Sequence, residues 1–216
     1  LTVMNSFKKY YGKNKLACIV NYPAIRTLKS NKKPPVKKKL IRIGILGALN
    51  SKRKNYKILK VALNGINIEQ KKNITLVLLG EAKNGYREPI IENFKKFVNI
   101  ECQKGYISQD KLEELTLSCH FLISLLKNGY GGRIKGTGSI SDARSTKRRL
   151  VIPKHADPEG EFSNFCYYYK DSTSLIKKIQ LLCKLFNQKY IPISKNMFDL
   201  YSNKRNMRVL LNELGL

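Results

Sequence analysis

Residues 135–142 (KGTGSISD) have the side chains and the glycine spacing of a phosphate-binding turn. They follow an apolar run over residues 120–126 and lead into a short helix-like segment over residues 139–147. Glycines let backbone amides approach an anion, and the N-terminus of the following helix favours negative charge. Asp142, about one turn into that helix, can accept hydrogen bonds from sugar hydroxyls. We therefore hypothesise that this stretch binds the diphosphate and ribose of a nucleotide-sugar.

The motif alone does not establish this function. Two glycines in a loop also occur where no ligand binds. The third glycine of the dinucleotide-binding fingerprint is absent, since Ser141 occupies its place. The inference therefore depends on the elements that surround the turn.

Apolar runs separated by helix-like segments predict the architecture. The expected strands cover residues 40–46, 74–79, 98–102, 120–126, 150–153 and 165–169. Amphipathic segments between and after them predict helices, the main ones beginning near Asn50 or Ser51, Pro89, Ser108 or Gln109, Ser139, and Ser172 or Ser174. Strands alternating with helices at short intervals indicate the α/β class with a doubly wound parallel sheet. Ligands of such sheets bind at the carboxyl ends of the strands.

Three regions are expected along the chain. The best boundary is the basic stretch over residues 26–39, which contains Pro34 and Pro35 and is typical of a solvated linker. The predicted divisions are residues 1–39, residues 40–190 as the Rossmann-like domain, and residues 191–216 as a C-terminal part. An amphipathic helix is expected over residues 196–214.

Composition limits the partners. The 216 residues include 42 Lys and Arg but 15 Asp and Glu, a net charge of +27 that favours polyanions or anionic membrane surfaces. The abundance of Lys, Asn and Ile is also what an AT-rich genome produces. No apolar run is long enough to span a bilayer, and the N-terminus lacks the apolar core of a signal peptide. The five cysteines are scattered and form no C-x-x-C pair, which is typical of the reduced thiols of a cytoplasmic protein.

Three cations, Lys52, Arg53 and Lys54, come between the first strand and its helix. The start of a helix normally favours acidic residues, so cations there oppose the macrodipole. This misfit is consistent with an anionic ligand, and equally with chance in so basic a chain.

The order of these motifs resembles the C-terminal, donor-binding domain of GT-B glycosyltransferases, most closely family 4, over about residues 40–190. The matching parts are the strand ending at Gly47, residues 76–80 (LVLLG), the strand and helix over residues 98–115, residues 121–124 (FLIS), residues 138–143, and residues 150–153 (LVIP). Single parts are unspecific, whereas six in the right order are moderately specific.

The resemblance implies a nucleotide diphosphate-sugar donor and a saccharide or lipid-linked acceptor. It places Lys54 near the diphosphate, phosphate on the backbone of residues 136–139, ribose on Asp142, and the nucleobase near Gly105 and Tyr106. Arg133 and Lys135 are candidates for neutralising the phosphates. The full candidate set is Lys54, Tyr106, Arg133, Lys135, Gly136, Thr137, Gly138, Ser139 and Asp142.

The chain departs from the family pattern at two places. Ala48 stands where the family usually has an arginine, and the first of its paired glutamates falls at Ile134 or Lys135. No catalytic residue is therefore assigned. No Asp-x-Asp motif occurs in the sequence, so no metal or other cofactor is expected, and cations with backbone amides would stabilise the leaving diphosphate. Neither His120, expected to pack in the core, nor His155, expected in a loop, is a convincing base.

The resemblance also implies context for the whole protein. Residues 1–25 resemble the end of an N-terminal acceptor domain, so this chain alone is expected to bind donor but transfer little. A role in surface polysaccharide synthesis is implied. Cytoplasmic location, peripheral at the inner membrane face, would suit the basic charge.

Two other functions are weighed. A basic nucleic-acid-binding protein is suggested by the net charge and the twelve tyrosines, but the cations are spread widely and no known nucleic-acid-binding motif occurs. A dinucleotide-dependent oxidoreductase is disfavoured because the glycine-rich turn comes late in the chain. Nucleic acid is therefore not the expected partner.

Overall fold

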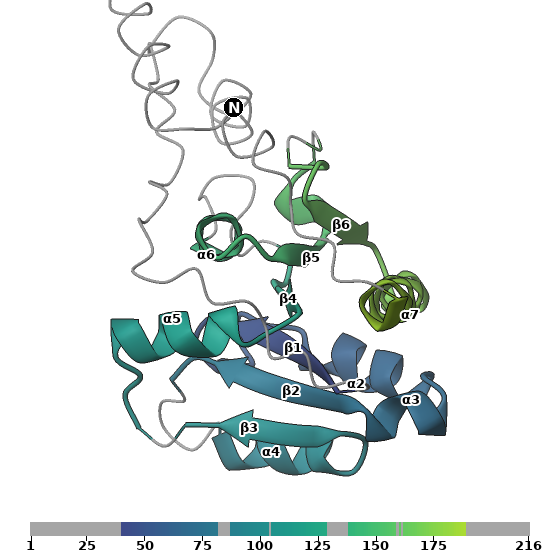
Figure 1. Cartoon of the computed structure of the whole chain (residues 1–216), viewed down its shortest axis with the longest axis horizontal. Helices are drawn as coiled ribbons and strands as arrows, with labels where there is room; N and C mark the ends of the chain where they lie inside the picture. The colour runs from purple at the N-terminus through teal and green to yellow at the C-terminus, as the bar shows by residue number, and fades with distance from the viewer. Residues whose placement is uncertain are drawn as a thin grey trace, which may run out of the picture.

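The fold is described from a computed structural model, which covers residues 40–81, 87–103, 105–128, 138–158, 160 and 162–188. It confirms the doubly wound parallel sheet. Six strands lie in the order β3-β2-β1-β4-β5-β6, and every neighbouring pair is parallel (Figure 1). Their bounds are β1 (Ile41–Leu46), β2 (Ile74–Leu79), β3 (Asn99–Cys102), β4 (Phe121–Ile123), β5 (Arg149–Pro153) and β6 (Cys166–Tyr169).

Helices cover both faces of the sheet. On one face, α2 (Tyr56–Asn64), α4 (Arg87–Lys95) and α7 (Ser172–Gln188) share a core with the strands, and the short α3 (Ile68–Lys72) follows α2. On the other face, α5 (Gln109–Leu117) and α6 (Gly138–Ser145) enclose a second core. A 3₁₀ turn, η1 (Lys154–Ala156), follows β5. Strands β1 and β2 are buried almost throughout, as expected of central strands with helices on both sides.

Local signals account for several element ends. Helix α5 begins at Gln109, one of the two predicted starts, and Ser108 caps it, since its hydroxyl accepts a hydrogen bond from Lys111 N. The cap of α2 is Asn55 and not Asn50 or Ser51, because residues 51–53 form a turn before the helix. The cap of α7 is Asp171, whose carboxylate accepts from Ser174 N. Both predicted caps were therefore wrong by a few residues.

Other differences concern the length and number of the secondary-structure elements. Strand β4 is shorter than predicted, because the apolar residues after Ile123 leave the sheet and pair with the loop that follows β1. Helix α3 and η1 were not predicted. The segment over residues 1–39 and the helix predicted over residues 196–214 lie outside the described residues.

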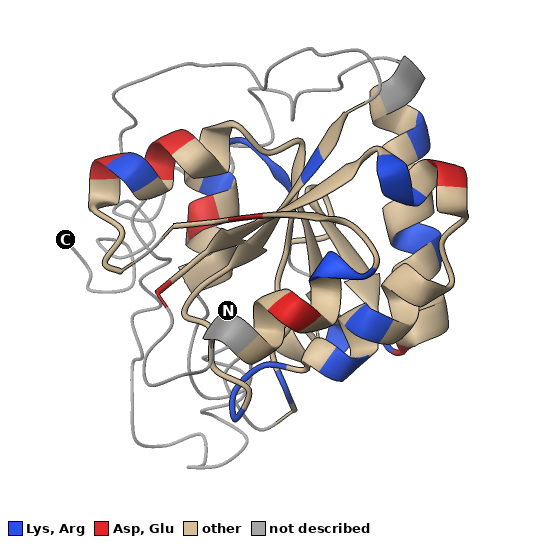
Figure 2. Cartoon of the chain, turned by 90° about the horizontal axis from the view of Figure 1, so that it is seen from below, with Lys and Arg blue, Asp and Glu red and all other residues tan. Residues whose placement is uncertain are grey.

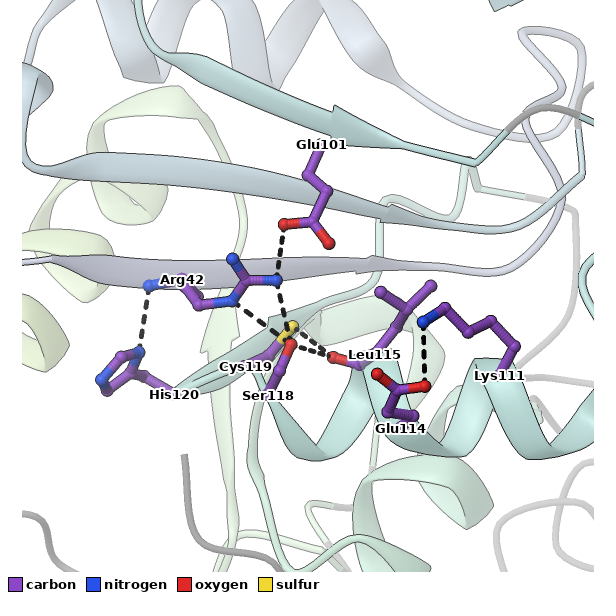
Figure 3. A network of polar contacts seen from close by, with 8 residues as sticks. All are labelled: Arg42, Glu101, Lys111, Glu114, Leu115, Ser118, Cys119 and His120. Carbon is purple, nitrogen blue, oxygen red and sulfur yellow. Dashed lines mark hydrogen bonds and ion pairs between the residues drawn. The ribbon is translucent and has the colours of Figure 1, made fainter. Parts of the chain in front are cut away.

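A polar network fixes α5 to the sheet on the face away from α7 (Figure 3). The Arg42 guanidinium lies 2.6 Å from Glu101 Oε2 and donates to Ser118 Oγ at 3.0 Å, and Ser118 Oγ donates to Leu115 O at 2.7 Å. The network thus joins β1, β3 and the end of α5.

His120 packs as predicted, at the start of β4. Its Nδ1 accepts a hydrogen bond from Arg42 N at 3.0 Å, and its ring lies edge-on to Phe186 of α7. Burial, together with the smaller effects of the nearby Arg148 and Arg42 charges, lowers its pKa to about 4. The imidazole is therefore neutral and structural at physiological pH.

Candidate functional site

The sheet reverses its winding between β1 and β4, which are hydrogen-bonded neighbours. Helix α2, which follows β1, packs on one face, and α6, which follows β4, packs on the other. The chain after β1 and the chain after β4 therefore continue into helices on opposite faces of the sheet. The carboxyl edge between two such strands is the place where open α/β sheets bind their ligands.

The loop between β1 and α2 is tied to its neighbours by backbone hydrogen bonds. Asn55 N donates to Leu125 O at 2.7 Å, and Lys127 N donates to Arg53 O at 3.0 Å. On the other side, Leu49 N donates to Glu81 O at 2.9 Å. Three loops, after β1, β2 and β4, are thus linked into one edge of the candidate site.

Lys54 lies inside this edge and not on its surface. Its side chain is 8% exposed, and its ammonium donates to the carbonyls of Leu46 and Gly47, the latter at 2.6 Å. Burial, together with the smaller effect of the nearby Arg53 charge, lowers the pKa of Lys54 to about 7. The Lys54 side chain therefore packs against the end of β1. With a pKa near neutral, its protonation state can change when an anion binds nearby.

The cations before α2 do not oppose the helix dipole in the way the sequence suggested. Helix α2 begins at Tyr56, so Lys52 and Arg53 lie in an exposed turn whose first residue, Asn50, accepts a hydrogen bond from Lys52 N. The predicted conflict with the helix start is therefore wrong, and it gives no evidence for an anion.

Helix α6 carries the described part of the glycine-rich turn. It begins at Gly138, where a Cβ would meet nothing within 4 Å, and Ile140 and Ala143 anchor it in the core. Ser139 and Asp142 lie on the half-buried side of the helix. The first turn of α6 is therefore anchored in the core, and a side-chain atom added at Gly138 would meet open space.

The end of α6 is built by an αL residue. Lys147 has φ 53°, Lys147 N donates to Arg144 O, and Arg148 N donates to Ala143 O. These two bonds are the Schellman pattern, formed here without glycine. They turn the chain directly into β5 and so fix the helix relative to the sheet.

Tyr106 is the most exposed large hydrophobic side chain described, at 80%, and follows Gly105, which has φ 73°. It lies beyond the carboxyl end of β3, separated from β1 by β2. An exposed ring there has the space to stack on a planar group, and the nucleobase contact expected of it stays a prediction.

The loop after β5 contains a buried carboxylate that sequence reasoning passed over. Asp157 is 0% exposed, and it accepts hydrogen bonds from Phe162 N at 3.1 Å and from the Tyr168 hydroxyl. Burial raises the pKa of Tyr168, and the hydrogen bond to Asp157 raises it further. Asp157 therefore holds the loop between β5 and β6 in place through these two hydrogen bonds.

Four of the predicted residues, Arg133, Lys135, Gly136 and Thr137, lie outside the described residues. Lys54 follows β1 and α6 follows the neighbouring strand β4, whereas Tyr106 follows β3, two strands from β1. Lys127, whose ammonium donates to Ser51 O at 2.7 Å, was not predicted, because a lysine after a strand has no distinguishing neighbours. Within the described part of the chain, no three His, Cys, Asp or Glu residues are placed to hold a metal ion.

No protein-family model matches the sequence, and no match was found among curated proteins. Solved structures do match. The C-terminal domain of a glycosyl transferase group 1 family protein from Francisella tularensis has a TM-score of 0.57 at 15% identity, covering 79% of this chain and 96% of that one. The catalytic domain of cholesterol-α-glucosyltransferase from Helicobacter pylori has a TM-score of 0.51 at 17% identity, covering 78% and 98%.

Longer enzymes match over part of their length. A UDP-forming α,α-trehalose-phosphate synthase from Burkholderia xenovorans, in complex with glucose-6-phosphate, has a TM-score of 0.58 at 8% identity, covering 82% of this chain and 43% of that one. The chain thus spans less than half of this enzyme and nearly all of the isolated Francisella domain. It has the fold of the C-terminal domain of GT-B glycosyltransferases.

Proposed function

We propose that this chain is the donor-binding part of a glycosyltransferase that transfers a sugar from a nucleotide diphosphate-sugar to a saccharide or lipid-linked acceptor, in surface polysaccharide synthesis. The observation that carries the proposal is the reversal of winding between β1 and β4, with α6 beginning in the loop that follows β4. The fold shared with glycosyltransferase domains supports it.

The proposed donor site extends along the carboxyl edge. The diphosphate binds at the first turn of α6, with the predicted residues Arg133, Lys135, Gly136, Thr137, Gly138 and Ser139, and the ribose binds Asp142. The base stacks near Tyr106. Lys54, which is buried under the loop after β1, lies near the diphosphate in this proposal. The site takes no metal ion in this proposal, and the protein is cytoplasmic.

The direct test is a thermal-shift titration with UDP, GDP, ADP and their sugars. A ligand that binds only the folded state raises the melting temperature, by an amount set by its concentration relative to its dissociation constant. At least one nucleoside diphosphate is expected to stabilise the chain, and the matching monophosphate less. If all of them leave the melting temperature unchanged while oligonucleotides bind tightly and lose affinity with salt, the basic nucleic-acid-binding function is favoured instead.

Asp142→Ala is expected to weaken nucleoside diphosphate binding about tenfold or more, because hydrogen bonds to a carboxylate contribute about 1.5–3 kcal/mol. Asp142 is half-buried and belongs to neither core, so the unliganded melting temperature should change less than the affinity. Calorimetric titration gives the affinity. Asp110→Ala, on α5, is the matched control and should bind like the parent. Equal affinity in parent and Asp142→Ala would refute the ribose assignment.

Donor binding is also expected to take up a proton. The pKa of Lys54 is about 7, so at about pH 8 most of its side chains are neutral in the free protein. A diphosphate close to Lys54 favours its charged form, which raises that pKa and draws a proton from the buffer. Titrations in buffers of different ionisation enthalpy measure the uptake.

Lys54→Met should abolish most of this uptake. If the parent shows none at about pH 8 while binding is intact, Lys54 remains bound to the Leu46 and Gly47 carbonyls and does not act on the phosphates. That result would show that Lys54 does not have the role near the diphosphate that the family resemblance implies. The Asp142 test would be unaffected.

A further inference from the structure

The charged residues are divided unequally between the two faces of the sheet. Helices α2, α3 and α7 together contain seven lysines and one glutamate, a net charge of +6, whereas α5 on the opposite face contains one lysine and three acidic residues, a net charge of −2. In Figure 2 the helices on the right carry mostly blue positions, and the red positions of α5 lie on the left. The net basic charge of the described helices is therefore directional.

Aliphatic side chains are exposed among these lysines. Of the four large hydrophobic residues exposed in the described part of the chain, Val61 (54%), Ile68 (68%) and Leu181 (41%) lie on α2, α3 and α7. The fourth, Tyr106, lies at the carboxyl edge. Exposed aliphatic residues are ordinary when scattered, but three on one face, each within a lysine-rich helix, form a mixed basic and apolar surface.

The spacing on each helix places these groups side by side. On α2, Lys57 lies three residues before Lys60 and four before Val61, and on α7, Lys177, Leu181 and Lys184 follow at intervals of four and three. Such residues lie on one side of a helix. Their apolar partners point inward, since Leu59, Leu63, Ile179 and Leu182 are buried.

The two helices form a continuous surface. They share one core, and a Cβ at Gly65, the C-cap of α2, would lie 2.7 Å from Ile176 Cδ1 of α7. Val61 lies one helical turn before Gly65, so it lies on the side of α2 that borders α7. The surface defined by Lys57, Lys60, Val61, Lys177, Leu181 and Lys184 is called the α2–α7 face.

We propose that the α2–α7 face docks on an anionic lipid bilayer. Lysine ammonium groups reach the lipid phosphates while their methylene stems, with Val61 and Leu181, enter the boundary between headgroups and acyl chains. No helix among the described residues is long and apolar enough to cross a bilayer. Docking here therefore means binding parallel to the surface.

The residue types favour a bilayer over nucleic acid. Helices α2, α3 and α7 contain no arginine, the side chain best suited to bidentate phosphate contacts. The exposed aliphatic side chains of this face can neither stack on bases nor hydrogen-bond to their edges. An apolar centre bordered by lysines is the pattern of an interfacial helix surface.

Docking through this face leaves the carboxyl edge of the sheet uncovered, because the helices pack on the face of the sheet and the candidate site lies at its edge. If the proposed function holds, a lipid-linked acceptor could then approach the site from the same membrane. The docking surface itself does not depend on that function.

The test is co-sedimentation of the full chain with vesicles of phosphatidylglycerol and phosphatidylcholine, compared with phosphatidylcholine alone. Binding is expected only to the anionic vesicles. Replacing Lys57, Lys60, Lys177 and Lys184 by Gln should lower the partition coefficient about fivefold for each lysine. Replacing Lys95, Lys96, Lys111 and Lys147 by Gln removes the same charge elsewhere and should have a much smaller effect.

A second pair of changes tests the apolar part. Val61→Gln with Leu181→Gln leaves the charge unchanged and should still weaken vesicle binding severalfold, because two apolar side chains no longer enter the interface. The proposal is overturned if anionic vesicles are not bound, or if both sets of lysine changes weaken binding equally. It is also overturned if the glutamine pair has no effect while the α2–α7 lysine changes abolish oligonucleotide binding. Nucleoside diphosphate titrations of the same variants should match the parent, which separates this result from the donor site.

Discussion

Gly80→Ala is expected to destabilise the protein by about 3 kcal/mol and to lower donor affinity with it. A Cβ at this position would lie 2.5 Å from Gly47 C and 2.8 Å from Ala48 N. Both are backbone atoms, so no side chain can rotate away to make room. The peptide after Gly47 would have to move, and that peptide forms the loop above Lys54.

The surrounding hydrogen bonds make this movement costly. Gly47 N donates to Leu79 O at 3.1 Å, and Leu49 N donates to Glu81 O at 2.9 Å, so the loop is held to β2 on both sides of Gly80. Gly47 itself has φ 79°, which few other residues adopt. A shift of this peptide therefore breaks backbone hydrogen bonds as well as packing contacts.

Gly138→Ala is the matched control, at the same edge of the sheet. A Cβ there meets nothing within 4 Å, so the substitution should leave stability unchanged or raise it by about 0.4–1 kcal/mol. Urea denaturation compares the stability of the two variants. Calorimetric titration of a nucleoside diphosphate compares Gly80→Ala with the parent, because Gly138 is itself part of the proposed phosphate site. If Gly80→Ala proves as stable as Gly138→Ala, the loops after β1 and β2 do not pack as closely as described.

Periodicity and composition predicted most of the sheet, because a strand buried on both faces needs a continuous apolar run. The run over residues 74–79 matches β2 residue for residue. The glycines that end β1 and β3 were also informative, since both adopt positive φ. The fold class thus follows from local patterns and the rules of parallel sheets.

The sequence predicted the ends of elements less well, since competing signals stand close together. Asn50, Ser51 and Asn55 are all good caps, and the choice among them depends on the pairing of Asn55 N with Leu125 O, seventy residues away in the chain. The same pairing removes the end of the predicted fourth strand from the sheet. Local propensity contains no information about such contacts.

The direction of a side chain was equally hard to infer. Lys54 stands at the expected place in the chain, yet its ammonium turns inward to two carbonyls of its own loop. Asp157 gave no motif, and its role depends on Phe162 and Tyr168, which reach it only in the folded chain. Residue type and spacing predicted where the candidate site lies, and tertiary contacts decide what each side chain does there.

Arg148→Met is expected to lower the free energy of unfolding by about 3 kcal/mol, roughly 1 kcal/mol for each of the three hydrogen bonds that are lost. Arg148 is 3% exposed, and its guanidinium donates to Leu117 O at 2.7 Å, Cys119 O at 2.8 Å and Thr146 O at 3.1 Å. Leu117 O and Cys119 O lie at and just after the end of α5, and Thr146 O lies just after α6. The Arg148 side chain therefore joins the segments that lead into β4 and β5. Methionine fills much of the volume but leaves the carbonyls without this donor.

Arg149→Met is the control for Arg148→Met, because the neighbouring arginine is half-buried and donates to one carbonyl, Asn164 O at 2.7 Å. Its loss should cost about 1 kcal/mol. Arg148→Lys should fall between the two, since one ammonium keeps the charge but cannot match the planar fork. Equal losses from the two methionine variants in urea denaturation would show that the three carbonyls find other donors. A larger loss from Arg148→Met would identify it as the link that holds the α6 side of the candidate site to the centre of the sheet.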